Sequence, residues 1–389
     1  MRIEQLHASA WDDRGRDRWH QVIAGMPVSS PFLSTAWTNA WMRVFGRVLK
    51  PVQVSVLDAS GAPIGSCLLT SRVRRTTVVP HVRVHLNTDG ENAMDSVIVE
   101  HNALLAIAGA EDVVARAIAG HVVDMRADEF HVAGAGEVEV SRLLRAFPSW
   151  TADIEWHDAP FVNLELLRAA SRSHLDVLSR NTREQLRRSL ARYQCRGPIV
   201  VEAARTVCEA EAMFVELVAL HESRWQAVGH TGAFASASRR EFHRAFIREG
   251  VPTGNAQLLR ITAGGDTIAV LYNLVANGRV NFYQSGLRLE DDKHLKPGMA
   301  AHHLAIQYCL EHGYAEYDFL SSAPGEGRYK SSLANESRQL AQLTLARPGW
   351  RCRYFNGLRR LRHGARRIGR SFTLRRVPRR TAEMPERSS

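Results

Sequence analysis

The stretch AQLLRITAGGDTIAVLYNLVANGRVNFYQSGLRLEDDKHLKPGMAAHHLAIQYCLEHG, residues 256–313, decides the fold. Two apolar runs, 256–262 and 267–275, flank the turn sequence AGGD and predict two neighbouring strands. Asn277-Gly278 is a strong hairpin turn that leads into a third strand, 279–287. This part of the chain is therefore expected to form an antiparallel sheet.

A helix is expected to follow the hairpins. A charged loop passes into Pro297-Gly298, which suits the first turn of a helix, and Gly313 suits the position just after its last turn. Strands at 314–320 and 340–346 complete the predicted domain.

The start of this helix has the chemistry of an anion site, because the first N–H groups of a helix lack acceptors and the helix dipole favours negative charge. Gly298 and the alanines after it leave room for a phosphate to approach the backbone, and Lys296 adds charge. The candidate cradle for a pyrophosphate is Lys296, Pro297, Gly298, Met299, Ala300 and Ala301. An ordinary structural helix start is the alternative, since Pro-Gly is common there.

The rest of the chain reads as mixed α/β. Strands are predicted at 52–57, 64–71 and 129–133, and helices near 108–119, 137–146, 174–193, 209–227 and 238–248. Trp37 and Trp41 recur at helical spacing after Ser34, which favours a core-facing stripe over a ligand groove. The arginines of the 174–193 helix lie off its apolar stripe, as a solvated face or an anion-binding surface: Arg180, Arg183, Arg187, Arg188 and Arg192.

Length and charge limit the class of protein. A chain of 389 residues suits two domains, and charged residues scattered through the first twenty positions predict no secretory signal. Charges also interrupt the most apolar stretch, 103–123, so we expect a cytoplasmic protein. The five cysteines form no CxxC pair, which makes a disulfide or metal role improbable.

The basic charge is concentrated at the C-terminus. The net charge is +11, and residues 351–380 hold 12 arginines and no acid, so the rest of the chain is near −1. Leu358, Leu361, Ala365, Ile368 and Phe372 share one helix face among the arginines. This tail, Arg351 to Arg380, is predicted to lie on an anionic membrane surface at the inner face of the cytoplasmic membrane, with an anionic nucleotide as the alternative.

Several local sequences together resemble a known family. They are PFLSTAWTNAWMRVFG (31–46), LSRNTREQLRRSLARY (178–193), LHESRW (220–225) with GAF (232–234), and YDFL (317–320) with GRYKSSLANE (327–336). They look like the BioF2-like or CelD-like subfamily of the GNAT superfamily, tandem-GNAT proteins related to the FemAB/FemX transferases and often found with exopolysaccharide or cellulose synthesis. The resemblance covers about residues 31–347.

The resemblance implies an α/β (α+β) fold of tandem GNAT-like domains, with mixed, mostly antiparallel sheets flanked by helices. A degenerate domain at 1–164 and an acyltransferase domain at 165–347 precede a basic, amphipathic or disordered tail at 348–389. Strand 279–287 takes the place of the strand beside which acyl-CoA lies. The Gly-rich pyrophosphate loop of typical members is reduced here to HLKPGMA. Acyl-CoA would contact Gln284, Ser285, Gly286, Leu287, Lys296, Gly298, Met299 and Ala300.

Catalytic roles follow from what N-acyl transfer needs: an uncharged amine, a route for its proton and donors to the oxyanion. Asp318 is a candidate to orient the amine or take its proton, or else caps a turn. By resemblance Lys330 is a candidate to bind a phosphate or carboxylate of the acceptor, or else it is a surface lysine. Tyr283 is a possible acid or a packing residue. By resemblance the acceptor would contact His221, Arg224, Trp225, Phe234 and Tyr329. HESRW lacks the second His of HExxH, so no zinc site is predicted.

The leading hypothesis is an N-acyltransferase that uses acetyl-CoA or another acyl-CoA and acts on an amine or amino sugar in exopolysaccharide or cell-envelope synthesis. A FemX-like transferase with aminoacyl-tRNA as donor is less favoured, since no aromatic-interleaved RNA motif accompanies the basic tail. A catalytically silent GNAT-like scaffold is the third hypothesis. No DNA partner is expected.

Overall fold

The computed structural model describes residues 2–8, 11–26, 30–74, 80–88, 97–227, 229–321 and 327–349. The predictions for the basic tail lie outside these residues.

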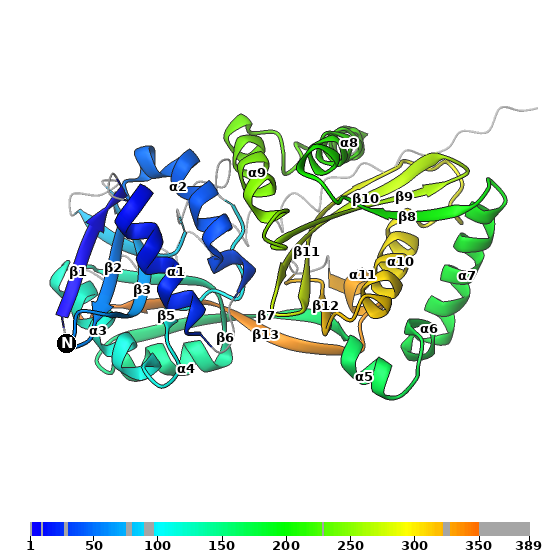
Figure 1. Ribbon diagram of the computed structural model, residues 1–389. Helices are drawn as coiled ribbons and strands as arrows, with labels where there is room; N and C mark the ends of the chain where they lie inside the picture. Colours follow the sequence, from blue (N-terminus) through cyan, green and yellow to red (C-terminus); the bar gives the residue numbers. More distant parts are fainter. Residues whose placement is uncertain are drawn as a thin grey trace, which may run out of the picture.

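The same order of elements occurs twice along the chain (Figure 1). The first half contains β1 (Arg2–His7), α1 (Arg16–Ala24), α2 (Thr35–Leu49), β2 (Val52–Leu57), β3 (Pro63–Arg74), β4 (His81–Leu86), α3 (Glu111–Asp124), β6 (Glu129–Gly136), α4 (Glu137–Ala146) and β7 (Thr151–Asn163). The second contains β8 (Ile199–Ala203), α8 (Val207–Ala227), α9 (Ala237–Gly250), β9 (Ala256–Ala263), β10 (Asp266–Ala276), β11 (Arg279–Leu287), α10 (Pro297–Glu311), β12 (Glu316–Asp318), α11 (Gly327–Ser331) and β13 (Glu336–Ala346). Between the halves lie α5 (Leu164–Ala169), α6 (His174–Val177) and α7 (Arg180–Gln194).

All strands in the described part of the chain belong to one 13-stranded sheet, in the order β1-β2-β3-β4-β6-β13-β7-β12-β11-β10-β9-β8, with β5 (Leu105–Ala106) beside β3. The halves exchange their last strands, since β13 pairs with β6 and β7 pairs with β12. In Figure 1 the orange β13 runs beside β7 from one half into the other. The mixed, mostly antiparallel α/β architecture is confirmed, but two separate sheets do not form.

This exchange gives the sheet an approximate internal symmetry. In each half the strand after the hairpins crosses over through a helix to a parallel neighbour: β4 pairs with β6, and β11 with β12. The central pair, β7 and β13, is antiparallel from Glu336↔Phe161 to Ala346↔Thr151. The domain limits 1–164 and 165–347 stay a prediction, because each half is completed by the other's last strand.

Helices cover both faces of the sheet. On one face, residues of α1 and α2 share a single hydrophobic cluster with residues of α8 and α9. Trp37 of α2 lies in this cluster, 4.7 Å from the ring of Phe242 and 5.3 Å from that of Phe246. Trp41 is also buried, so the core-facing stripe predicted for α2 is confirmed. Apolar packing thus joins the two halves.

Local sequence accounts for most boundaries. Asn277 and Gly278 both have positive φ, 49° and 71°, which is the geometry of the hairpin turn predicted between β10 and β11. The helix predicted at 174–193 is wrong as one element. It breaks before α7, because the Ser179 hydroxyl accepts the N–H of Thr182 and starts a new helix.

Candidate functional site

The open edge of β11 is the first feature of the site. β11 pairs with β12 over three residues, Arg279↔Glu316 to Asn281↔Asp318, whereas its other edge pairs with β10 as far as Leu287. Beyond Asn281, no strand in the described ranges lies against the edge that faced β12. The backbone of the predicted donor residues 284–287 therefore borders the gap where the two strands diverge.

The N-terminus of α10 borders the same gap. The N–H of Lys296 donates to Ser189 Oγ of α7 at 2.9 Å, which holds α7 against the start of α10. Gly298 and Met299 lie in the first helical turn, whose N–H groups have no acceptor within the helix. Lys296 is exposed, and so is Arg188 next to Ser189. Free N–H groups beside two cations suit an anion.

The missing side chain of Gly298 makes room for Tyr329. A Cβ at this position would lie 2.6 Å from Tyr329 Oη and 3.2 Å from Leu287 Cδ1. The space that a side chain at Gly298 would need is therefore occupied by Tyr329. Burial of the Tyr329 hydroxyl raises its pKa. Tyr329 packs α11 against the start of α10, and with 37% of its surface exposed it remains a predicted acceptor contact.

Lys330 lies at the end of β12. Its Nζ donates to the carbonyl of Phe319 at 2.7 Å and to that of Ser321 at 3.3 Å, and it lies 5.8 Å from the centre of the Phe282 ring. Phe319 follows β12 directly and Phe282 follows the last paired residue of β11. The ammonium group is therefore placed where the two strands separate.

Asp318 is completely buried. His101 Nε2 lies 3.0 Å from Asp318 Oδ2, the N–H of Leu320 donates to Oδ1 at 2.7 Å, and Arg338 Nε lies 3.8 Å from Oδ2. Burial by itself raises the pKa of Asp318, but the hydrogen bond and the charges of its basic neighbours outweigh it and lower the pKa. With no exposed surface and a lowered pKa, Asp318 is poorly placed to take a proton from an amine. It ties the first half to the end of β12.

Glu100 is the residue that sequence reasoning missed. It is 5% exposed, and its Oε2 accepts the N–H of Ser321 while its Oε1 accepts the Ser321 hydroxyl, both at 2.7 Å. Burial raises the pKa of Glu100 and is only partly offset by these bonds. No spacing in the sequence relates Glu100 to Ser321, because the contact exists only when the halves meet.

His221 is a structural link. Its Nε2 accepts the N–H of Ala233 at 3.0 Å, so its Nδ1 carries the proton that is donated to the Ser285 carbonyl, also at 3.0 Å. Burial lowers the pKa of His221. Both nitrogens are used, so His221 positions β11 against α8 and has no free group for an acceptor.

The other predicted acceptor residues differ in exposure. Phe234 is completely buried in the shared cluster and has no surface that an acceptor could contact. Arg224 and Trp225 are exposed near the C-terminal end of α8, with the Trp225 ring 6.0 Å from that of His221. These two remain predicted acceptor contacts.

Tyr283 and Gly286 show how tightly β11 is held. The Tyr283 ring is half-buried, 5.1 Å from His243 and 5.8 Å from Trp37 of the first half, which favours packing. A Cβ on Gly286 would lie 2.5 Å from the carbonyl oxygen of Leu217 in α8. Its missing side chain therefore allows contact with α8, and a donor would meet only its backbone.

Two histidines of α10 are buried and bonded. His302 Nδ1 lies 2.9 Å from Tyr317 Oη, and His303 Nδ1 lies 2.9 Å from His174 Nδ1. Burial lowers the pKa of both His302 and His303 to about 3. They fix α10 in its place beside the gap.

Metal ligands and membrane spans were also sought. Within the described ranges, no group of three or more His, Cys, Asp or Glu side chains is arranged to hold a metal ion. No helix in the same ranges is both long enough and apolar enough to cross a bilayer.

A tandem α/β sheet with diverging parallel strands beside a helix N-terminus defines a GNAT-fold, acyltransferase-like protein. Residues 180–331 match the sequence model of the acetyltransferase (GNAT) domain, so the chain carries a domain of this superfamily. The match spans α7 to α11 and contains Lys296, Tyr329 and Lys330. A search of curated proteins finds no match.

Solved structures share the fold of both halves. FemX is 9% identical with a TM-score of 0.57, covering 88% of this chain and 96% of its own. The C-terminal domain of a putative lysylphosphatidylglycerol synthetase from Agrobacterium fabrum is 11% identical with a TM-score of 0.52, covering 85% and 90%. L-PGS from Bacillus licheniformis is 10% identical with a TM-score of 0.52, covering 85% and 91%. At these identities the likeness establishes the fold.

Proposed function

We propose that this protein is an N-acyltransferase, with the acyl donor along the open edge of β11 and the amine acceptor beside Lys330. The observation that supports this most directly is the three-residue pairing of β11 with β12. It leaves a backbone edge free next to an anion-suited helix start, with an ammonium group where the strands part. A long donor with an anionic end and a reactive carbonyl end matches that arrangement.

The chemistry needs no covalent intermediate. An uncharged amine attacks the donor carbonyl, and the developing oxyanion accepts hydrogen bonds from Lys330 Nζ and from backbone N–H groups of 284–287. The amine proton passes to the Ser321 hydroxyl, whose own proton passes to Glu100 Oε1, its hydrogen-bond partner at 2.7 Å. The tetrahedral intermediate then collapses, the bond between the acyl carbon and the donor sulfur breaks, and the departing thiolate takes the proton back from Glu100 through Ser321. Glu100 suits this role because its raised pKa makes it a better proton acceptor than Asp318.

For the donor we favour acetyl-CoA or another acyl-CoA. The N–H groups of Gly298 and Met299 would bind the pyrophosphate, with Lys296 and Arg188 supplying charge. The acceptor would be an amino sugar or similar amine in exopolysaccharide or cell-envelope synthesis. That class rests on the sequence resemblance to the BioF2-like and CelD-like proteins.

A donor of the aminoacyl-tRNA kind is the second candidate. Two observations favour it: Tyr329 fills the space above Gly298, and the similar structures are named FemX and lysylphosphatidylglycerol synthetase. A catalytically silent scaffold is the third, and it predicts that no donor binds.

The test is a thermal-shift and calorimetric comparison of acetyl-CoA, longer acyl-CoAs and charged tRNA on the full chain. The donor should raise the melting temperature with concentration, because it binds the folded state. Stabilisation by charged tRNA but by no acyl-CoA would move the proposal to the second candidate. Failure of every donor to bind would leave the scaffold.

A variant then tests the chemistry. Lys330→Met should lower the rate of acyl transfer roughly a hundredfold or more, as removal of an oxyanion donor does. The affinity for the donor should stay within about twofold of the wild type, a smaller change than the loss of one charge-assisted hydrogen bond to the bound donor would cause. Lys293→Met, on the exposed loop before α10, is the matched control and should keep full activity. Equal activity of the two variants would refute the role of Lys330.

A further inference from the structure

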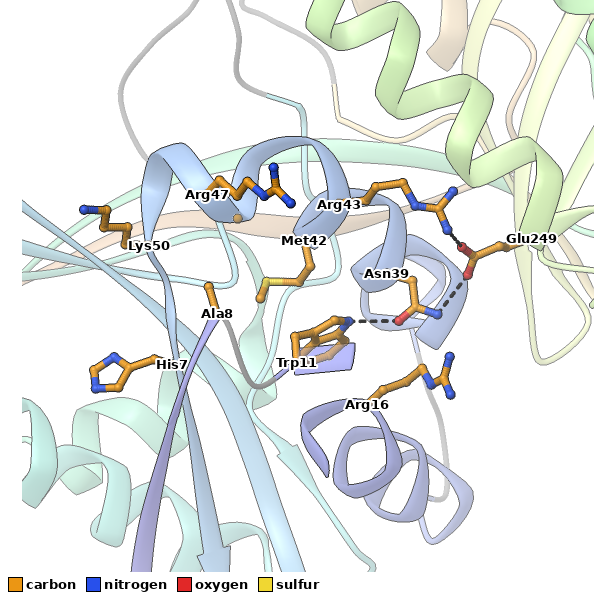
Figure 2. Close-up of a pocket in the computed structure, with 11 residues that line it drawn as sticks. His7, Ala8, Trp11, Arg16, Asn39, Met42, Arg43, Arg47, Lys50 and Glu249 are labelled. Atoms are coloured by element: carbon orange, nitrogen blue, oxygen red, sulfur yellow. Dashed lines mark hydrogen bonds and ion pairs between the residues drawn. The ribbon is translucent and has the colours of Figure 1, made fainter. Parts of the chain in front are cut away.

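A pocket separate from the gap beside β11 lies where the two halves meet, on the face covered by α1, α2 and α9. It is an open hollow of about 920 Å³. Its lining comes from β1, the segment before α1, α2 and the end of α9 (Figure 2): His7, Ala8, Trp11, Arg16, Asn39, Met42, Arg43, Gly46, Arg47, Lys50 and Glu249.

Positive charge dominates this lining. Among the lining residues that the structure describes, four side chains are permanently cationic and Glu249 is the single carboxylate. Glu249 is already occupied, because Oε2 accepts Asn39 Nδ2 at 2.8 Å and Oε1 accepts Arg43 Nη2 at 2.9 Å. Figure 2 shows both α2 side chains directed at Glu249. The carboxylate that could balance the pocket is therefore used to join α2 to α9.

Three cations remain: Arg16 on α1, Arg47 on α2 and Lys50 just after it. No ion pair within the described residues includes any of them. Elsewhere on the surface, arginines pair with carboxylates, as Arg196 does with Glu290. The dipole at the end of α2 accounts for a cation at Arg47, but it does not account for Arg16, which comes from another helix.

The base of the pocket is apolar. Trp11 and Met42 are 4% and 7% exposed, and the Trp11 indole N–H donates to Asn39 Oδ1 at 3.0 Å. The polar group of the indole is therefore satisfied within the protein. An apolar base under a cationic rim matches a ligand with a flat uncharged part and a compact multiple negative charge.

We propose that this pocket binds a small molecule with two adjacent phosphate groups, of the nucleoside diphosphate class. A hollow of this volume is in the range of small-molecule sites, whereas a membrane or a nucleic-acid duplex would need a flatter or longer surface. The diphosphate contacts Arg16, Arg47 and Lys50, and the nucleoside lies towards Trp11 and Met42.

The test is titration calorimetry of the full chain with inorganic pyrophosphate, uridine diphosphate, adenosine diphosphate and orthophosphate, at a low salt concentration of about 50 mM to limit screening. The Arg16→Gln/Arg47→Gln double variant should bind diphosphates at least about tenfold more weakly, since each lost charge-assisted bond contributes severalfold. Arg116→Gln is the matched control. Arg116 is an exposed arginine of α3, a helix that packs on a different hydrophobic cluster and does not line the pocket, so this variant should bind diphosphates as the wild type does.

The outcomes separate cleanly. Diphosphate binding that is lost in the double variant and kept in the control supports the pocket, and tighter binding of nucleotides than of pyrophosphate supports the apolar base. Equal binding by both variants, or no binding by the wild type, overturns the proposal. Acyl-CoA binding is measured in parallel and should not change in the double variant. Loss of acyl-CoA binding together with diphosphate binding would place the donor in this pocket and refute its placement on β11, whereas the diphosphate result stands whether or not acyl-CoA binds.

Discussion

Acid should destabilise this protein through the imidazoles that hold α10. His302 lies between the rings of Phe282 and Phe319, at 4.4 and 5.1 Å, and its Nδ1 is 2.9 Å from Tyr317 Oη. Burial, with the nearby charge of Lys330 as a smaller cause, lowers its pKa to about 3. The folded protein therefore keeps this imidazole neutral at pH values where an unfolded chain protonates it.

The sign and size follow from proton binding. Between pH 6.5 and pH 3 the unfolded state holds one more proton per such histidine than the folded state, so the free energy of unfolding falls as the pH falls. At pH 5.0 the unfolded pKa of about 6.5 is about 1.5 units away, and each buried imidazole then costs about 2 kcal/mol. His303, whose pKa burial also lowers to about 3, adds a similar loss.

The assay is urea unfolding at pH 7.5 and pH 5.0 of the wild type, His302→Gln and the exposed His230→Gln. The substitution at His302 lowers stability at both pH values, but the loss between them should be about 2 kcal/mol smaller than in the wild type. The His230→Gln chain should show the wild-type loss. An unchanged pH dependence in His302→Gln would refute the argument that burial keeps this imidazole neutral.

Three further predictions concern the packing of β11 on α8, the contact of Asp318 with the first half, and the basic tail. Gly286→Ala should cost about 2 kcal/mol or more in urea unfolding, because its Cβ would lie 2.5 Å from a backbone oxygen of α8. Gly120→Ala, with nothing within 4 Å, should gain up to about 1 kcal/mol, and a similar effect at both sites would contradict the close approach. Asp318→Asn should lower stability by about 3 kcal/mol, since it removes the buried carboxylate that His101 pairs with, and activity lost without stability would restore its predicted catalytic role. The full chain should sediment with anionic vesicles at low salt and a chain ending at Arg347 should not, while indifference of both would exclude the membrane as the partner of the tail.

Local sequence predicted the hairpin sheet and the helix after it. Asn277-Gly278 specifies a turn that few other dipeptides adopt, so β11 was predicted with its observed limits, Arg279–Leu287. Pro297 and Gly313 likewise bound α10. These signals act within a few residues, so they need no information about the rest of the fold.

The candidate site was predicted only in part. Lys330 and the helix start at Lys296 lie beside the open edge of β11, and their roles towards the acceptor and the donor stay predictions. The purpose of Gly298 could not be predicted, because a glycine that admits a phosphate and one that admits Tyr329 look the same in a sequence. Glu100 gave no signal, since its partner Ser321 is supplied by the other half.

The sequence by itself determined the hairpin turn at Asn277-Gly278, the limits of β11 and the start of α10, because each depends on neighbouring residues. Only the tertiary structure decided that the halves exchange β7 and β13. The first part of β7 is mostly exposed and carries no alternating apolar pattern, so no strand was predicted there. Its pairing with β13 joins Phe161 to Glu336 through backbone hydrogen bonds. Because every residue offers the same backbone groups, the sequence does not show which strand will be the partner. A partner so distant along the chain is selected by the packing of α2 against α9 and by the His101–Asp318 contact, which exist only once both halves have folded.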